Sequence, residues 1–483
     1  MLSPRVTVLV AVALAAQVVY AGHIDHVSNQ SADYIRIGSR NAALDGADAA
    51  YYNPAGTALM EKGFYLQASN QSFLKDYTAT YDGTEYASTE PSWIVPNAYA
   101  LYTTGKWSAF FNFTAPAGGG ALVYDDGLPM MAMTAETVEQ GATMALLDGG
   151  VIRDQLIAAG GGAVDATTAA ALADLYSVNT AWDGDLTGSS SYLGFTLGGA
   201  FAFTEKISVG LAARYVYSAK ALVGEVDWET SLSVDVGAVP NPALEPLVTG
   251  VRDGLNNAIA TDAHGMEMLS AGTAVDMETK ATGVGAIVSV DYRPTESLNL
   301  ALRFESPTVL EYTYTVNDGK DFNGQFEDGE TERHDLPGIV GIGAQYALGN
   351  AMLTTSWNGY LLGWADTKSD ERGADGYDDD YASLGYDLSL GAAYTLKERY
   401  TLSAGYCYTD IGGSSKTYTD FEYALDSHAF SGGAKLGILD NFFVTLAYAY
   451  SLFTDGESED GLVTYDKSVH VLALGLELLL GRD

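Results

Sequence analysis

Apolar and polar residues alternate at every second position in many segments between Gly63 and the end of the chain. In ISVGLAARYVYS, residues 207–218, the odd positions hold Ile, Val, Leu, Ala, Tyr and Tyr, whereas the even positions are mostly small or polar. The segments 297–306 and 471–480 repeat this pattern. A period of two is typical of β-strands with two unlike faces. The pattern predicts strands at about 63–73, 96–104, 106–115, 190–203, 206–228, 278–293, 297–315, 335–346, 350–365, 382–395, 399–411, 425–438, 441–454 and 464–480.

The connections between these segments alternate between short turns and long loops. The short turns read TTGK, FTEK, RPTES, ALGN, TLKER and ILDN. The long loops lie near 74–95, 116–189, 229–277, 316–334, 366–381, 412–424 and 455–463. One apolar face per strand is aliphatic with aromatic ends, and the other carries Gly, Ala, Ser and isolated charges. This asymmetry is typical of outer-membrane barrels, whose closed sheet pairs every backbone group. We therefore expect an all-β transmembrane protein with an antiparallel barrel of about fourteen strands.

The residues before the first strand divide into two parts. The opening MLSPRVTVLVAVALAAQVVYAG has one basic residue, an apolar run and small residues near Ala21, which predicts a signal peptide at 1–21 and export from the cytoplasm. Residues 22–62 contain the compact DAAYYNPAGTAL, a turn-rich stretch placed before any strand. The barrel is expected to occupy 63–483, with its longest loops at 116–189 and 229–277.

Composition narrows the function further. The chain has 24 Lys+Arg against 62 Asp+Glu, a formal net charge of −38, which excludes nucleic-acid binding by phosphate neutralisation. The acidity predicts a solvated exterior, with divalent-cation binding beside anionic lipid headgroups as the alternative. Only one cysteine is present, so internal disulfides are excluded.

Metal and catalytic motifs are weak. We expect residues 23–26 to form a flexible tail and not a metal site, because two imidazoles and one carboxylate without further ligands do not define a coordination geometry. We expect the acidic loop 318–330 to be solvated and not to be an EF-hand calcium site, because its glycines do not fall at the positions that an EF-hand loop requires. No Gly-x-Ser-x-Gly elbow occurs. We expect no metal, no cofactor and no enzymatic activity.

Two of the long loops contain helical patterns. The segment ALEPLVTGVRDGLNNAIA has apolar residues at helical spacing, and a second region spans about 134–176. These helices either pack on one another or form a hydrophobic groove for a ligand. The residues of that stripe are Leu244, Leu247, Val248, Val251, Leu255 and Ile259.

The chain resembles the FadL/TodX-type outer-membrane transporters of long-chain fatty acids and other hydrophobic compounds. The resemblance rests on GSRNAALDGADAAYYNPAGTALM, on the mid-barrel segments 198–220 and 283–307, and on the later segments 336–348 and 425–451. It implies a fourteen-stranded barrel plugged by an N-terminal hatch, with Asn53, Pro54 and Ala55 as the hatch motif. It also implies capture of cargo at extracellular loops, a site near the plug, and release by plug movement and a gap in the wall. FTAPAGGG is the candidate for that gap, because proline removes a ladder donor and glycine permits a bend; the gap residues are Pro116, Gly118, Gly119 and Gly120.

Three cations fall on the predicted lumen face, namely Arg214, Arg303 and Lys435. Each could meet the carboxylate headgroup of a cargo molecule. The alternative is that each pairs with the plug or with a lumen acid, because an unpaired buried charge is costly. Those acids are Asp291, Glu305, Asp387 and Glu477.

These features favour an outer-membrane transporter of a Gram-negative-type bacterium for passive uptake of fatty acids or other hydrophobic compounds. The acidic loops would repel anionic fatty acids, and a neutral hydrocarbon or aromatic compound avoids that repulsion. Its partners would be the cargo, the outer-membrane lipids and the outer-membrane assembly machinery. The alternatives are a barrel enzyme of lipase or protease type, a general porin, or a surface adhesion protein.

Overall fold

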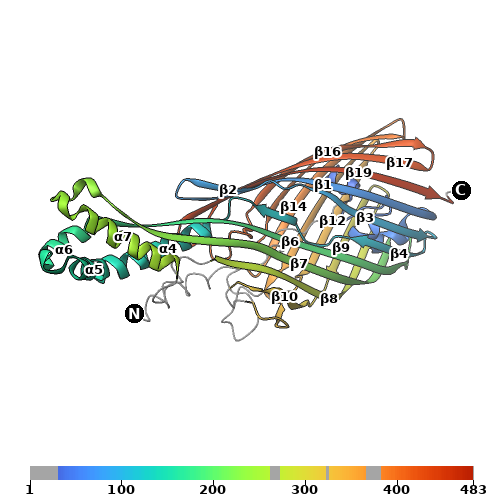
Figure 1. Ribbon diagram of the computed structural model, residues 1–483. Coiled ribbons are helices and arrows are strands. Elements are labelled where there is room, and N and C mark those ends of the chain that lie inside the picture. The colour runs from blue at the N-terminus through green and yellow to red at the C-terminus, as the bar shows by residue number, and fades with distance from the viewer. Residues whose placement is uncertain (1–30, 262–271, 323–325, 366–381, 482–483) are drawn as a thin grey trace.

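The computed structural model describes residues 31–261, 272–322, 326–365 and 382–481, and these form one closed antiparallel sheet with helices (Figure 1). The predicted signal peptide and residues 22–30 lie outside the described residues. The sheet has nineteen strands. Fourteen of them close the barrel: β1 (Gly63–Tyr81), β3 (Ser92–Thr103), β4 (Trp107–Thr114), β6 (Tyr176–Ala202), β7 (Ile207–Val234), β8 (Gly272–Tyr292), β9 (Leu298–Glu305), β12 (Gly338–Leu348), β13 (Ala351–Leu361), β14 (Gly385–Leu396), β15 (Tyr400–Asp410), β16 (Ser427–Leu439), β17 (Phe442–Phe453) and β19 (Val463–Leu480).

The ring closes where the first strand meets the last. β1 pairs with β19 from Phe64 opposite Leu480 to Tyr81 opposite Val463, and its other edge pairs with β3. Closure pairs the first strand with the last, so neither of them forms a free edge of the ring, as a membrane barrel requires. The prediction of fourteen antiparallel strands is confirmed. The other five strands extend the sheet beyond the ring, namely β2 (Thr84–Ser88), β5 (Gly120–Tyr124), β10 (Glu311–Asp321), β11 (Thr331–Arg333) and β18 (Gly456–Glu457).

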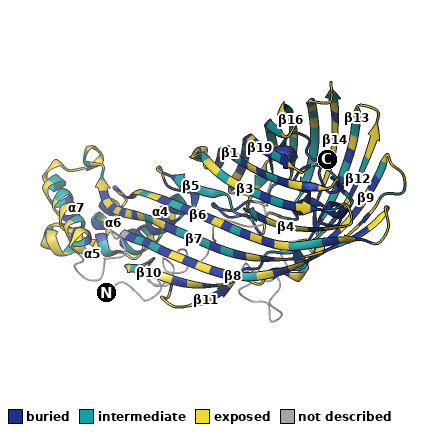
Figure 2. Cartoon of the chain, turned by 90° about the vertical axis from the view of Figure 1, so that its right-hand side faces the viewer, coloured by how far each residue is buried: buried dark blue, intermediate teal, exposed yellow. Residues whose placement is uncertain are grey.

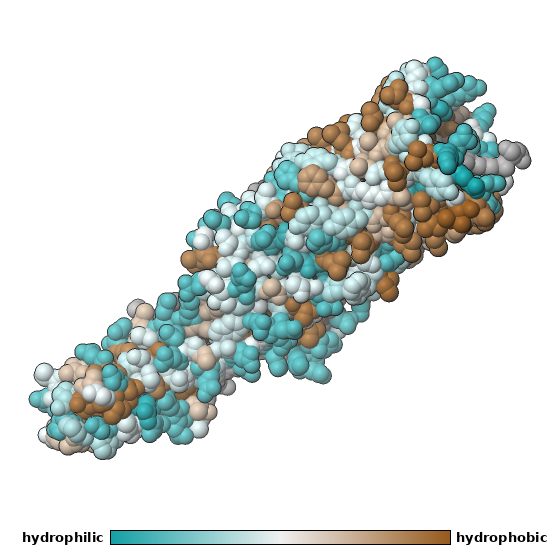
Figure 3. Space-filling view, turned by 90° about the horizontal axis from the view of Figure 1, so that it is seen from above, coloured by the Kyte–Doolittle hydropathy of each residue, from teal (hydrophilic) through white to brown (hydrophobic). Residues whose placement is uncertain are grey.

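The barrel wall has an apolar outer face and a small, polar inner face. On β19, Leu472, Leu474 and Leu476 are 45–49% exposed, whereas Ala473 between them is 6% exposed. Figure 2 shows the same alternation of buried and exposed residues along the other strands. Figure 3 shows the hydrophobic side chains gathered over the barrel end of the molecule and hydrophilic ones over its long middle part. An outward apolar belt of this kind matches lipid and not water.

β6 and β7 run far beyond the belt. They contain 27 and 28 residues, although about 9–11 residues of a tilted strand suffice to cross a bilayer. The prediction that 176–189, 229–234 and 272–277 belong to loops is therefore wrong, because these residues continue the ladders of β6, β7 and β8. Outside the belt the strand faces meet water and helices, so the alternation that marked the other strands is weaker there.

Helices cover the outer part of these two strands. They form a cluster at the far end of the molecule, away from the C-terminus (Figure 1). None of the helices in the described ranges is long and apolar enough to cross a membrane. The helices of this region are α4 (Pro129–Thr143), the π-helix Met144–Asp148, α5 (Val151–Gly160), α6 (Ala166–Ala173) and α7 (Glu245–Ala260).

The predicted strand 297–315 is two strands. β9 ends at Glu305, and Pro307 lies in the break before β10 begins at Glu311. Proline lacks the N–H that a ladder needs, which explains the interruption. Beyond the break, β10 pairs with β8 and β11, whereas β9 pairs with β12 inside the ring.

Residues 31–62 fold inside the barrel and are called the plug below. They contain α2 (Ala32–Ile35), α3 (Ala49–Tyr52) and the 3-10 helix η2 (Ala55–Leu59), and nearly all of them are buried. Wall glycines allow this contact. A Cβ at Gly343 would lie 2.6 Å from the backbone of Asn41 and Ala42, and one at Gly210 would lie 2.8 Å from the Ala55 nitrogen. The plug backbone therefore rests directly on the wall.

Candidate functional site

The hatch motif joins the plug to the wall. The Asn53 Nδ2 donates to Asp291 Oδ2 of β8 at 2.6 Å and to the Ala43 carbonyl at 3.1 Å. Pro54 precedes η2 with helical backbone angles, and the Ala55 carbonyl accepts a hydrogen bond from Ser208 Oγ of β7 at 2.6 Å. The motif is thus a rigid turn with hydrogen bonds to two wall strands.

The plug carries its own buried charge network. Asp33 pairs with Arg36 at 2.6 Å, and Arg40 pairs with Asp45 at 2.8 Å and Asp48 at 2.5 Å. Burial opposes ionisation of Asp33, but the nearby cations, with Lys435 of β16 the strongest and Arg36 next, hold the pKa of Asp33 well below its usual range. The plug therefore satisfies most of its charges internally, and Lys435 adds one ionic tie to the wall at 3.3 Å from Asp33.

Two of the predicted lumen cations form one cluster around the plug. The Arg214 Nη1 lies 2.7 Å from Glu305 Oε2, and the Arg303 Nη1 lies 3.3 Å from Glu305 Oε1. Arg303 also donates to the Tyr51 carbonyl at 2.6 Å. Both guanidinium groups lie over the Tyr51 ring, at 4.8 and 5.4 Å from its centroid. Cation–π contacts of this kind strengthen when they are removed from water.

The third predicted cation, Lys435, pairs with Asp33 of the plug and Glu477 of β19. All three cations thus have partners on the plug or on wall acids, as the second of the two interpretations predicts. Arg303 also lines the cavity described next, and Lys435 lines a second cavity of about 220 Å³ near the short-turn ends of β13–β15. The role of these cations in cargo binding stays a prediction.

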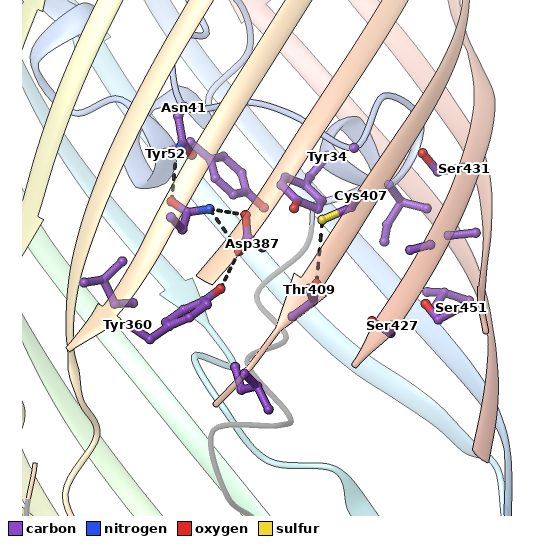
Figure 4. A pocket seen from close by; sticks show the side chains of 18 of the residues that line it. Tyr34, Asn41, Tyr52, Tyr360, Asp387, Cys407, Thr409, Ser427, Ser431 and Ser451 are labelled. Carbon is purple, nitrogen blue, oxygen red and sulfur yellow. Dashed lines mark hydrogen bonds between the residues drawn. The ribbon is translucent and has the colours of Figure 1, made fainter. Parts of the chain in front are cut away.

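A cavity of about 190 Å³ lies between the plug and the wall. Tyr34 and Tyr52 of the plug stack on each other with centroids 5.2 Å apart and form one side. Asp387 of β14 faces them and accepts hydrogen bonds from Tyr360 Oη at 2.6 Å and Asn358 Nδ2 at 3.0 and 3.2 Å. Figure 4 shows these side chains around the cavity. Its other described lining residues include Ile35, Gly38, Asn41, Tyr51, Arg303, Ile339, Cys407, Thr409, Ile411, Leu425, Ser427, Ala429, Ser431, Ala449, Ser451, Phe453 and Val471.

A cover lies on the long-loop side of this cavity. It consists of the start of α4 and the segment 411–426, whose apolar residues share one cluster with Ile35 of the plug. The buried Asp420 joins the two parts, since its Oδ2 accepts from the Met130 backbone N–H at 2.8 Å and its Oδ1 accepts from Tyr465 Oη at 3.3 Å.

The cover is expected to loosen as pH rises. Burial raises the pKa of Asp420 from 3.8 to about 6. The stabilisation from its protonated form is complete below pH 3.8 and is lost as pH rises through 6, at a cost of about 3 kcal/mol. Hydrogen exchange of 128–143 and 411–426, corrected for intrinsic rates, should therefore speed up between pH 4 and 7. In Asp420→Asn this pH dependence should disappear, whereas the exposed Asp125→Asn should keep it. An unchanged slope in Asp420→Asn would contradict the assignment.

The predicted wall-gap residues lie where the ladder is interrupted. β4 ends at Thr114 and pairs with only the second half of β3, from Ala98 to Thr103. Residues 115–119 follow without a strand, and β5 then resumes pairing with β6 at Gly120. Positive φ angles of +97° at Gly118 and +77° at Gly120 permit the bend that follows Pro116. The use of this interruption as an exit stays a prediction.

The predicted loop groove is not open. Val248, Val251, Leu255 and Ile259 of α7 are at most 7% exposed and pack in one cluster with α5, α6 and the ends of β6 and β7. Leu244 and Leu247 are half-buried against the same cluster. The groove interpretation is therefore wrong, because neighbouring helices cover the apolar stripe.

Metal-ligating clusters of three or more His, Cys, Asp or Glu do not occur among the described residues. The candidate tail at His23–His26 lies outside the described residues, as do the acidic loop residues 366–381. The loop 318–330 is described except at 323–325.

The geometry defines a plugged fourteen-stranded barrel with an apolar outer belt and a lumen cavity at the plug. Solved structures of this kind include the toluene transporter TodX of P. putida (12% identity, 95% of this chain and 100% of that chain, TM-score 0.59). A FadL homologue of Pseudomonas aeruginosa is also similar (13%, 94% and 99%, 0.59). The toluene transporter TbuX of Ralstonia pickettii is a third (14%, 94% and 100%, 0.55). No family model and no curated protein sequence matches this chain. The barrel has the fold of these transporters.

The sequence reasoning missed the cavity itself. Asp387 was assigned to the lumen by strand parity, but its partners Asn358 and Tyr360 were not singled out. Tyr34 and Tyr52 belong to the plug, and its contacts with the wall do not follow a regular residue spacing that could be recognised in the sequence. A signal existed in the wall, because inward positions of β15 and β16 are mostly small: Thr401, Ser403, Gly405, Cys407, Thr409, Ser427, Ala429, Ser431 and Gly433. Such a stripe leaves room beside a plug.

Proposed function

We propose that the protein is a passive outer-membrane channel for small hydrophobic compounds. Cargo enters at the long-loop side, passes the cover, rests in the cavity at the plug and leaves through the interruption at 115–119. The observation that carries this proposal is the lumen cavity between Tyr34 of the plug and Asp387 of the wall, inside a barrel with an apolar outer belt. The similar structures support it, since they are two toluene transporters and a FadL homologue. The apolar belt and the predicted leader support an outer-membrane location.

The proposed mechanism needs no energy source besides the concentration gradient. The cover and the plug meet in one apolar cluster, so a hydrophobic molecule that loosens the cover also reaches Ile35 of the plug. The plug satisfies most of its charges internally, so a shift of the plug breaks few ion pairs besides Asp33 with Lys435. Differential binding of cargo to the loosened state supplies the driving force for the shift.

Transport is tested directly in liposomes. Purified protein in sealed vesicles should speed the entry of labelled toluene well beyond that of protein-free vesicles, and the internal label should level off at equilibrium. A large, steady ion conductance of the full chain would instead indicate a general porin. Hydrolysis of esters or peptides by the purified protein, abolished by a single Ser or Asp substitution, would indicate an enzyme. Either result, without accelerated toluene entry, contradicts the proposal.

The exit is tested by tying the two edges of the interruption together. A Cβ at Gly120 would lie 3.3 Å from the Ser92 Cβ, close to the separation in a disulfide. The φ of +77° at Gly120 strains any side chain there, so the reduced pair must first transport as well as the Cys407→Ser protein. In a Cys407→Ser background, the pair Ser92→Cys and Gly120→Cys should transport when reduced and lose most of its transport when oxidised. The Cys407→Ser protein alone is the control and should not respond to oxidant. Equal transport by the oxidised and reduced forms would place the exit elsewhere.

A further inference from the structure

The cavity at the plug is small. Its volume of about 190 Å³ lies below the roughly 300–1,000 Å³ of sites for drug-sized ligands. An engineered protein cavity of about 150 Å³ holds benzene. The cavity therefore has room for one six-membered ring with one or two small substituents, and a long alkyl chain would have to extend out of it.

The lining of the cavity combines apolar side chains with one buried hydrogen-bond acceptor, Asp387. Apolar contacts come from Ile339, Ile411 and Phe453, and the stacked rings of Tyr34 and Tyr52 form an aromatic side. Asp387 is 5% exposed and accepts two hydrogen bonds on Oδ2 and one on Oδ1. A carboxylate offers about four lone-pair sites, so Oδ1 retains acceptor capacity. The acceptor selects for a ligand that carries a hydrogen-bond donor.

The same lining opposes a negatively charged ligand. Arg303 is the one cation among the described lining residues, and it already pairs with Glu305 and donates to the Tyr51 carbonyl. Arg303 shares this one carboxylate with Arg214, and its Nε–H is buried without a partner among the described residues, so the opposition to a ligand carboxylate comes from the like charge of Asp387 alone. A fatty acid headgroup fits this site poorly.

We propose that the cavity selects an uncharged, single-ring aromatic compound with a hydroxyl group, of the phenol class. The hydroxyl donates to Asp387 Oδ1, and the ring lies among the plug tyrosines and the aliphatic wall. This inference rests on the proposed transport function and narrows its cargo. A plain hydrocarbon would leave the remaining acceptor capacity of Asp387 Oδ1 unused.

Three ligands that share one methyl-substituted ring test the inference: p-cresol, toluene and 4-methylbenzoate. Equilibrium dialysis against the purified full-length protein should show that p-cresol binds about tenfold or more tighter than toluene, since one hydrogen bond to a charged acceptor is worth that factor. 4-Methylbenzoate should bind most weakly. 4-Methylbenzylamine tests for a cationic ligand, and tighter binding of this ammonium than of p-cresol would overturn the inference.

Substitution of Asp387 tests whether this residue causes the preference for p-cresol over toluene. Asp387→Asn should reduce the preference for p-cresol over toluene severalfold, whereas Asp410→Asn, outside the cavity lining, should keep that preference. The ligand ranking of the unmodified protein tests the inference even if Asp387→Asn fails to fold. If toluene binds as tightly as p-cresol and still enters vesicles, the phenol inference fails and the transport function stands. If neither ligand binds or enters, the transport function fails.

Discussion

Deletion of residues 22–62 should convert a nearly silent barrel into a conducting pore. The described part of this segment fills the short-turn half of the lumen, and Ala32 and Ile35 support the apolar cluster under the cover. Without the plug, a lumen of fourteen strands is close in size to that of open porins of about 16–18 strands. Single-channel recordings in planar bilayers should show conductance on the order of tenfold or more above the full-length protein.

The wall is expected to survive this deletion because its buried cations keep partners of their own. Arg214 stays 2.7 Å from Glu305, and Lys435 keeps Glu477 when Asp33 is lost. Heat-modifiable gel mobility should confirm that the deleted protein still forms a barrel. A folded, inserted deletion variant that remained silent would show that the cover alone seals the lumen, and the plug would then not be the gate.

The barrel could be predicted from the sequence because lipid imposes a simple rule on it. Within the belt each strand has one face in hydrocarbon and one in a crowded lumen, so parity placed Arg214, Arg303 and Lys435 inward, where the structure has them buried or nearly so. The rule does not apply to the parts of the strands that extend beyond the lipid. The segment Asp183 to Ser191 is rich in Gly and Ser and resembles a loop, yet it continues the ladder between β6 and β7.

The site could be predicted only in part, since it depends on contacts between distant segments. Strand parity identified Asp387 as a lumen acid, but it could not show that Tyr34 lies across the same cavity. The helical stripe of α7 shows the opposite error. Its spacing correctly predicted a helix, but spacing cannot distinguish an open groove from a buried contact, and Val248 is fully buried.

Glu305→Gln should be the most destabilising conservative substitution in the lumen. Glu305 is the carboxylate partner of both Arg214 and Arg303, and the side chains of all three residues are 7% exposed. Loss of its charge leaves two buried guanidinium groups without an anion, and the removal of one partner from a buried ion pair costs about 3–5 kcal/mol. Urea unfolding in micelles, followed by gel mobility, should show a correspondingly lower midpoint.

The matched control lies at the short-turn end. Asp440 pairs with Arg399 at 3.0 Å on the surface, so Asp440→Asn should leave the midpoint unchanged. The double variant Glu305→Gln with Arg214→Gln should recover part of the loss, because it removes one of the two uncompensated charges. A single Glu305→Gln variant as stable as Asp440→Asn would refute the charge argument.

The same substitution should also release the plug. Arg214 and Arg303 both lie over the Tyr51 ring and clamp it to the wall, and Arg303 donates to the Tyr51 carbonyl. Once Glu305 no longer neutralises the two guanidinium groups, they repel each other beside the Tyr51 ring and the plug loses this clamp. Folded Glu305→Gln protein should therefore show more frequent channel openings than the full-length parent, and Asp440→Asn should not. Destabilisation without added openings would mean that the clamp supports the wall and not the plug.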